Sequence, residues 1–168
     1  MGLYAIYNGP MPTTAGQQKV TTNTVITTML QVKLGTQNFG KIVEWGISFD
    51  GSAAATPGKV ELCETGTIFG TVTASAAADI TKFGDPNLVD PSTSNFILGT
   101  SATGYTCSSE GSIVAVRMFD AQLLPPTQPY VKQFPLGREP MINISTAARI
   151  RVTFGAAINA ICYMVIEI

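Results

Sequence analysis

The sequence contains no histidine, and charged residues make up only 12% of its 168 residues, against about 25% in an ordinary domain. Without histidine no Ser-His-Asp or Cys-His arrangement can form, and the commonest general base at neutral pH is missing. The sequence also lacks the glycine-rich phosphate-binding patterns GxxxxGK[ST] and GxGxxG. We therefore expect no catalytic residues, no cofactor and no enzymatic activity.

Strong charge of either sign is absent as well, since the net charge is −1 and the two signs are interspersed. No basic stripe is available to neutralise phosphates, so nucleic acid is not an expected partner. The most apolar stretch, residues 156–168, is too short to span about 30 Å of hydrocarbon, so we expect no membrane partner. The first residues, MGLYAIYNGPMPTT, contain no cationic segment followed by an apolar run, which predicts that no cleaved signal exports the protein.

Only three cysteines are present, Cys63, Cys107 and Cys162, and no two of them have CxxC spacing. With no histidine to complete a zinc set, the sequence predicts no metal site. Free thiols are the expected state, because nothing in the first residues suggests an oxidising compartment. Cys63 and Cys162 lie in strand-like segments, where a thiol packs as a small apolar side chain.

The dominant pattern is alternation of apolar and polar residues with a period of two, which is typical of half-buried strands. In residues 41–50 it predicts one apolar face of Val43, Trp45, Ile47 and Phe49, with Trp45 in the core. The other predicted strands are residues 20–34, 59–65, 67–74, 95–100, 112–123, 141–145, 149–154 and 157–168. The sequence therefore predicts an all-β, single-domain β-sandwich over residues 19–168, jelly-roll-like in topology.

The last predicted strand is apolar on both faces. Ile161, Tyr163 and Val165 alternate with an equally apolar set on the opposite side. Such a strand either lies under a loop or meets another subunit, so these three side chains are candidate subunit contacts.

Two segments interrupt the strand pattern. Residues 1–18 contain two tyrosines, two prolines and three glycines and are predicted to form an extended arm. Its Tyr4, Ile6, Tyr7 and Pro10 are candidate contacts with a shell or a neighbouring subunit. Residues at about 75–110 are rich in Ala, Ser, Thr, Asp and Gly and are predicted to form a long loop excursion, since loops beyond about 15 residues are usually functional or disordered.

The segment YVKQFPLGREP, residues 130–140, is predicted to be a rigid connection without strand structure, because it contains two prolines and a glycine. An ordered connection and a contact loop are both consistent with this composition. As a contact loop it would present Phe134, Leu136, Arg138 and Glu139, and Arg138 could pair bidentately with a carboxylate.

Acidic residues offer one alternative to a non-catalytic protein. Glu44, Glu61 and Glu64 lie on neighbouring predicted strands and could converge as a glycosidase pair does. A solvent-facing position in alternating strands is the simpler interpretation of Glu44 and Glu61.

Several segments together resemble the small head proteins of tailed phages that infect actinobacteria. They are GLYAIYNGPMPTT, VEWGISFDGSAAATP with KVELCET, LGTSATGY, FDAQLLPPTQPYVKQFPLGREP and NAICYMVIEI. These proteins are similar to capsid decoration, or cement, proteins. The resemblance covers most of the chain and is weakest at residues 74–95.

The resemblance implies a β-sandwich that forms homotrimers on the outer surface of the icosahedral head, contacts the major capsid protein and stabilises the shell. It also implies assembly in the host cytoplasm. Two other structural roles remain open: a receptor- or carbohydrate-binding head-fibre or tail tip, in which Tyr105 and Tyr130 would form an exposed aromatic platform, and a tail-tube or tail-terminator protein, which would form rings.

Overall fold

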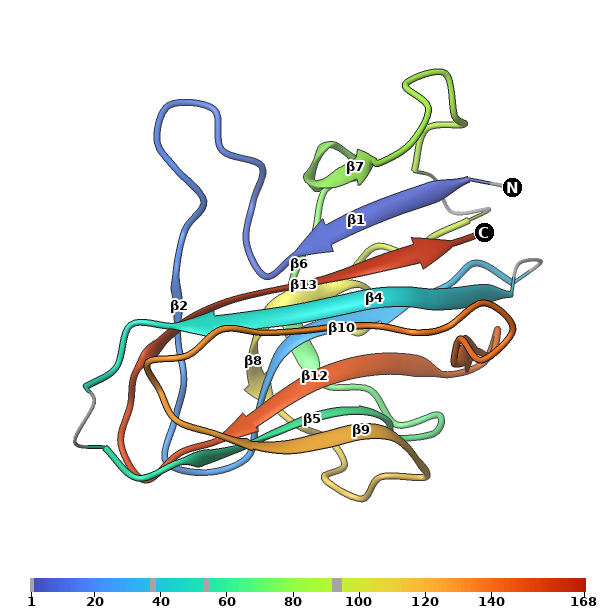
Figure 1. The fold of residues 1–168 in the computed structure, drawn as a ribbon. Helices are drawn as coiled ribbons and strands as arrows, with labels where there is room; N and C mark the ends of the chain where they lie inside the picture. Colours follow the sequence, from blue (N-terminus) through green and yellow to red (C-terminus); the bar gives the residue numbers. More distant parts are fainter. Residues whose placement is uncertain (1, 37–38, 53–54, 92–94) are drawn as a thin grey trace.

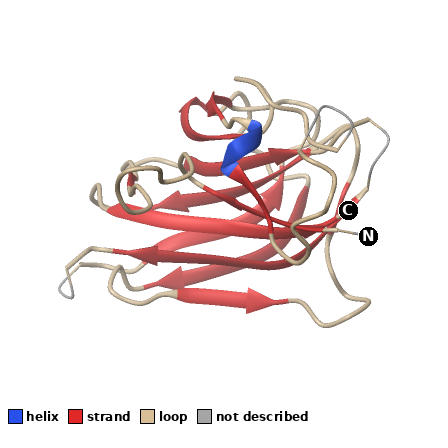
Figure 2. Ribbon diagram, turned by 90° about the horizontal axis from the view of Figure 1, so that it is seen from above, coloured by secondary structure: helices blue, strands red, loops and turns tan. Residues whose placement is uncertain are grey.

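The fold was analysed in a computed structural model that describes residues 2–36, 39–52, 55–91 and 95–168. Two antiparallel β-sheets pack face to face around one apolar core (Figures 1 and 2). The predicted all-β sandwich is therefore confirmed. Met1 of the predicted arm and residues 92–94 of the predicted excursion lie outside the described residues.

The first sheet has seven strands. Its order is β10 (Tyr130–Gln133), β4 (Gly40–Phe49), β13 (Asn159–Glu167), β1 (Leu3–Tyr7) and β7 (Ile80–Lys82), with β11 (Met141–Ile142) also paired with β4 and β2 (Val20–Thr21) with β13. A single turn of 3-10 helix, Ala77–Asp79, precedes β7.

The second sheet has six strands. Its order is β6 (Thr71–Ala74), β8 (Gly104–Ser109), β3 (Thr27–Lys33), β12 (Ala147–Thr153), β5 (Gly58–Glu64) and β9 (Arg117–Leu124). The chain switches sheets repeatedly, for example from β3 to β4, from β4 to β5 and from β12 to β13. Each switch brings residues from distant parts of the sequence into one core.

The core lies between the two sheets and follows the predicted alternation. Trp45 and Ile47 of β4 are buried, as predicted, and face buried side chains of β12 and β5. Cys63 and Cys162 are fully buried, as predicted, and all three cysteines are free. Burial of this apolar surface is the main stabilising contribution to the fold.

The predicted inward position of Val43 is wrong. A β-bulge places Val165 of β13 opposite Glu44 and the next residue, Ile166, opposite Ile42, so Val43 is the extra residue of β4. A bulge inserts one residue and reverses the alternation beyond it. Ile42 is consequently fully buried, whereas Val43 is only half-buried.

The predicted N-terminal arm is wrong for residues 3–7. They form β1, which pairs with β13 on one side and with β7 on the other (Figure 1). Tyr4 and Ile6 are buried in the core, so they are not candidate contacts. The segment escapes prediction because it is short and apolar on both faces, and its two partner strands come from distant parts of the sequence. The remainder, residues 8–19, connects β1 to β2.

A conservative substitution in β1 tests this correction. Ile6→Val is expected to lower the free energy of unfolding by about 1 kcal/mol, because it deletes one methylene from a packed core. The matched control is Ile113→Val, since Ile113 is 55% exposed and its truncation is expected to change stability by less than about 0.5 kcal/mol. Urea denaturation of both variants gives the two values. Equal effects would show that residues 3–7 are not part of the core.

Other predicted boundaries shift for a similar reason. Residues 130–133 were predicted to lie in a connection but form β10, which pairs with β4. The predicted excursion contains β7 and β8, so it is not one continuous loop. Conversely, the strand predicted at residues 95–100 is reduced to isolated bridges at Phe96 and Leu98.

Candidate interaction surfaces

The outer face of the first sheet carries three of the predicted contact residues. In the strand register Tyr7 of β1 lies opposite Tyr163 of β13, and Tyr163 lies opposite Gly46 of β4, which in turn lies opposite Val131 of β10. The two tyrosine rings are 5.4 Å apart between centroids. With Ile161 on the same face of β13, they form what we call the apolar band: Tyr7, Val131, Ile161 and Tyr163.

Exposure differs along this band. Val131 is 57% exposed, and Tyr7, Ile161 and Tyr163 are partly exposed. Val165 is only 2% exposed, between Ala5 and Glu44 in the register. The prediction that Val165 is a contact residue is therefore wrong, because its side chain has almost no exposed surface.

Polar groups fix the tyrosine side of the apolar band. The Tyr163 hydroxyl donates a hydrogen bond to Glu44 Oε1, and Gln133 Nε2 donates to Glu44 Oε2 at 2.6 Å. Burial and the Glu44 carboxylate raise the pKa of Tyr163, so the phenol remains a neutral donor. Gly46 makes room for the ring, since a Cβ at this position would lie 2.6 Å from a Tyr163 ring carbon. The arrangement holds a flat aromatic surface in one position.

The projecting loop, residues 134–140, extends from the edge of the same sheet. The Phe134 amide donates to the Val43 carbonyl at 2.9 Å, and the Ile42 amide donates to the Pro140 carbonyl at 2.9 Å. Both ends of the loop are therefore attached to successive residues of β4. Phe134 packs partly against the core, so its prediction as a contact is weakened.

The tip of the projecting loop is a tight turn. The Arg138 amide donates to the Pro135 carbonyl at 2.9 Å, and Gly137 has a φ of 82°, which is the positive φ that the third residue of a type II turn requires. The Gly137 amide donates to Glu139 Oε2 at 2.8 Å. Leu136 at the tip is 94% exposed. Arg138 has no ion pair among the described residues, so its predicted bidentate partner is not in this part of the chain.

Pro10, the last predicted contact, lies in the connection after β1. It is half-buried and borders a small hollow formed by residues 10–16 and Gln18. The projecting loop extends from the opposite edge of the first sheet, so Pro10 and the loop do not form one contact surface.

The outer face of the second sheet holds a buried charged cluster that the sequence did not reveal. Arg149 is fully buried. Its guanidinium donates to the Ile68 carbonyl at 2.7 Å, to the Glu110 carbonyl at 3.0 Å and to the Ser112 carbonyl at 3.3 Å. It also forms an ion pair with Glu110 Oε2 at 3.4 Å. Arg151 donates to the Ile113 carbonyl at 2.7 Å. Burial lowers the pKa of Arg149, and Glu110 opposes that change.

This cluster has a structural role. Arg151 also pairs with Glu61 of β5 at 3.1 Å, so Glu61 is buried and paired, and its predicted solvent-facing position is wrong. The two guanidinium groups fasten the connections at residues 66–70 and 110–116 across the sheet. A signal was available: arginines at i and i+2 in a predicted strand must share one face.

An aspartate bridges the edges of the two sheets. Asp120 of β9 is 7% exposed and accepts hydrogen bonds from Gln122 Nε2 and the Tyr130 hydroxyl, both at 2.8 Å, and lies 3.3 Å from Lys132 Nζ. Burial alone would raise its pKa, but the donors and Lys132 together hold the pKa below the usual 3.8. Burial and the bond to Asp120 raise the pKa of Tyr130 to about 12.

Asp120 is expected to make stability depend on acid. Since its pKa is lower in the folded than in the unfolded state, the ionised carboxylate stabilises the fold above about pH 4, and this contribution is lost as the pH falls through the folded pKa. Asp120→Asn should therefore destabilise the protein at neutral pH, and the difference from wild type should shrink below about pH 4. Urea unfolding of the wild type and of Asp120→Asn across this pH range measures the difference in their free energies of unfolding. A difference that does not change with pH would contradict the assignment.

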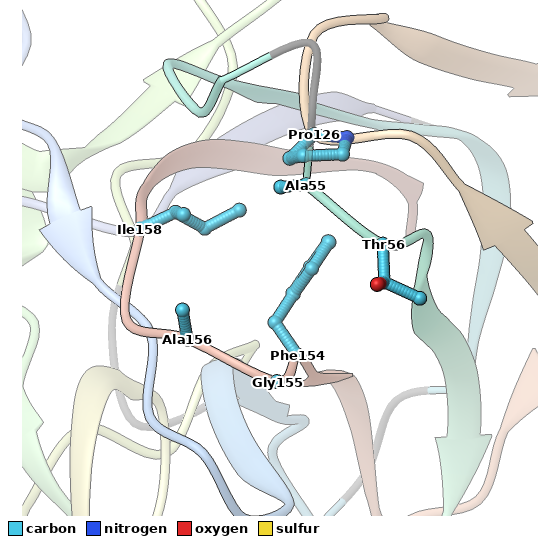
Figure 3. Close-up of a pocket in the computed structure, with 7 residues that line it drawn as sticks. All are labelled: Ala55, Thr56, Pro126, Phe154, Gly155, Ala156 and Ile158. Carbon is cyan, nitrogen blue, oxygen red and sulfur yellow. The ribbon is translucent and has the colours of Figure 1, made fainter.

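An open apolar pocket lies at one end of the sandwich. Its volume is about 280 Å³, and its lining residues are Ala55, Thr56, Pro126, Phe154, Gly155, Ala156 and Ile158. Phe154 points into the opening, with Pro126 and Ala55 on the opposite rim (Figure 3). The Phe154 ring packs against Phe49 with centroids 4.9 Å apart, which fixes the floor of the pocket.

The structure separates the three glutamates that could have formed a glycosidase pair. Glu44 belongs to the first sheet, whereas Glu61 and Glu64 belong to the second and pair with Arg151 and Arg117, so the three glutamates do not converge.

In the described ranges no three Cys, Asp or Glu side chains gather as metal ligands. Nor does any helix within the described part of the chain have the length and apolarity to cross a bilayer.

Tyr105 and Tyr130 do not form a common aromatic platform. Tyr105 lies in β8 of the second sheet, and Tyr130 lies in β10 of the first, where its ring is 5.3 Å from that of Trp45. Tyr7 and Tyr163 form a partly exposed aromatic pair on the first sheet.

Comparison with known proteins adds no assignment. No protein family model matches the chain, and neither the curated proteins nor the solved structures give a significant match.

Proposed function

We propose that this chain is a structural protein of a phage particle: a capsid decoration protein that forms trimers on the outer surface of the icosahedral head, contacts the major capsid protein and stabilises the shell. The observation that carries the proposal is the apolar band, which the described residues leave partly uncovered on the outer face of the first sheet. Exposed apolar surface held on rigid elements is typical of protein interfaces, whose cores are poor in charge.

The stabilising effect would follow from selective binding. A protein that binds the assembled shell but not its separated subunits stabilises the shell by mass action. The low charge of the chain is consistent with such a role, since contacts at subunit boundaries rely on shape and apolar burial.

The proposal is tested on shells assembled from the major capsid protein encoded in the same genome. The wild-type chain is expected to co-sediment with these shells and to appear at threefold positions in cryo-electron microscopy. Val131→Asp, which places a charge in the apolar band, is expected to weaken attachment or trimer formation. Val25→Asp is the matched control, since Val25 is 62% exposed and lies between β2 and β3. Density on the tail, or no attachment by the wild type, would overturn the proposal.

A second candidate function is carbohydrate recognition by a head-fibre or tail tip. The observation that favours it is the Tyr7 and Tyr163 pair beside Glu44 and Gln133, since aromatic faces with adjacent hydrogen-bonding groups suit sugar rings. A glycan array separates the candidates. Saturable glycan binding that Tyr7→Ala abolishes in a folded protein would favour this function over decoration.

A further inference from the structure

We infer that copies of this protein associate head to tail, with Leu136 of one copy inserted into the apolar pocket around Phe154 of the next. Leu136 is 94% exposed, the largest exposure among the large apolar side chains described. The pocket is the complementary feature: an apolar hollow that the chain leaves open. The contact itself does not depend on the proposed function. Only the closure of the assembly into a trimer rests on it.

Leu136 is presented on a stiff support. The turn from Pro135 to Arg138 is closed by its own backbone hydrogen bond, and both ends of the projecting loop are bonded to β4. Lys132 Nζ also lies 5.3 Å from the Phe134 ring centroid at the base of the loop. A side chain held in this way loses little conformational freedom on binding, so most of the benefit of burying it is retained.

The pocket has the size and chemistry to receive this side chain. A cavity of about 150 Å³ lined by aliphatic and aromatic groups holds a benzene ring, and this pocket has a volume of about 280 Å³. Among the described lining residues, Thr56 alone has a polar side chain. Small-molecule sites usually have several converging polar groups that orient the ligand. The lining therefore favours an aliphatic side chain over a small polar ligand.

The positions of the two features make the contact intermolecular. The projecting loop is bonded to Ile42 and Val43 near the beginning of β4, whereas the pocket lies beyond the end of β4, where the Gly51 amide donates to the Pro126 carbonyl at 2.9 Å. These are opposite ends of the sandwich (Figure 1). A ten-residue strand covers about 30 Å at about 3.3 Å per residue, so Leu136 cannot reach the pocket of its own chain.

A contact between two different surfaces has a predictable geometry. Each copy offers one leucine and one pocket, so the contact repeats and produces either a closed ring or an open filament. In the proposed decoration protein it closes into a ring of three. Burial of one leucine side chain corresponds to about a 10- to 100-fold change in Kd.

The test uses two variants that each destroy one half of the contact. Leu136→Asp removes the inserted side chain, and Ala156→Trp fills the pocket from its rim. Both positions are exposed, so the circular dichroism spectrum of each variant should match that of the wild type. By sedimentation velocity, each variant alone is expected to be a monomer at concentrations where the wild type is associated. Matched controls are Leu123→Asp, at another exposed leucine, and Ala157→Trp, at an exposed alanine outside the pocket; both should associate at least tenfold more tightly than the corresponding test variant.

Mixing the two variants gives the decisive result. Leu136→Asp retains its pocket and Ala156→Trp retains its leucine, so an equimolar mixture is expected to form heterodimers that cannot grow further. A mixture that stays monomeric, or a wild type that is monomeric at high micromolar concentration, overturns the inference. Attachment to capsid shells is measured separately. If the monomeric Leu136→Asp variant still attaches, both the contact and the decoration role are supported. If the mixture forms heterodimers but the protein never attaches to shells, the contact is supported and the decoration role is refuted.

Discussion

Replacing Arg149 with alanine is expected to lower the free energy of unfolding by about 3–5 kcal/mol, the range for removing one partner of a buried ion pair. The substitution leaves the Glu110 carboxylate without its cation and the carbonyls of Ile68 and Ser112 without their donor. Unsatisfied buried groups retain the full cost of their desolvation. Guanidinium denaturation of the purified variant measures the loss.

Two further variants, one at another arginine and one at the partner of Arg149, identify the cause. Arg138→Ala removes an exposed guanidinium that has no ion pair among the described residues and should change stability by less than about 0.5 kcal/mol. Glu110→Gln removes the charge of the partner but keeps an acceptor, so its cost should fall between the other two. If Arg149→Ala costs no more than Arg138→Ala, the guanidinium does not hold the connections over the second sheet.

Trp45→Ala is the other substitution with a large expected effect, also about 3–5 kcal/mol, because it deletes a fully buried aromatic side chain from the centre of β4. The ring contacts Tyr130, at 5.3 Å between centroids, and thereby connects β4 to the edge strand β10. The loss is measured by thermal and chemical denaturation.

Trp45→Phe is the matched control for this variant. Phenylalanine keeps much of the aromatic contact, and Trp45 Nε1 has no hydrogen-bond partner among the described residues, so no bond is given up. The phenylalanine variant is expected to lose less than half as much stability as the alanine variant. Equal losses would show that the shape of the indole, and not burial of an aromatic ring, is what β4 requires.

The sequence predicted local alternation within a strand better than pairing between distant strands. Alternation in β4 placed Trp45 and Ile47 correctly because a two-residue period is local and survives in any sandwich. It failed at Val43, where the extra residue of a bulge is set by the partner strand β13. It failed again at β1, whose five residues become a strand through pairing with β13 and β7. These pairings join distant segments, and a single sequence does not encode them in its local pattern.

The candidate surfaces show the same division. The exposed projecting loop was predicted, since its prolines and Gly137 determine a turn by local chemistry. The pocket was not, because its lining combines residues 55–56, Pro126 and residues 154–158. Arg149 and Arg151 were assigned to a strand, but the carbonyls that they bind lie in connections 37 or more residues away. Side chains that meet across such separations become visible only in the folded chain.

The two ends of the described chain are bonded to each other, and this determines how the protein can be re-engineered. The Gly2 amide donates to the Ile168 carbonyl at 2.7 Å, and the Ile168 amide donates to the Gly2 carbonyl at 2.9 Å. A short glycine-rich peptide could therefore join them into a circular backbone without altering any strand, and new termini could be opened at an exposed turn elsewhere. In the uncircularised protein, two domains fused to residues 2 and 168 would leave the molecule at the same corner. The two fused domains would therefore lie side by side.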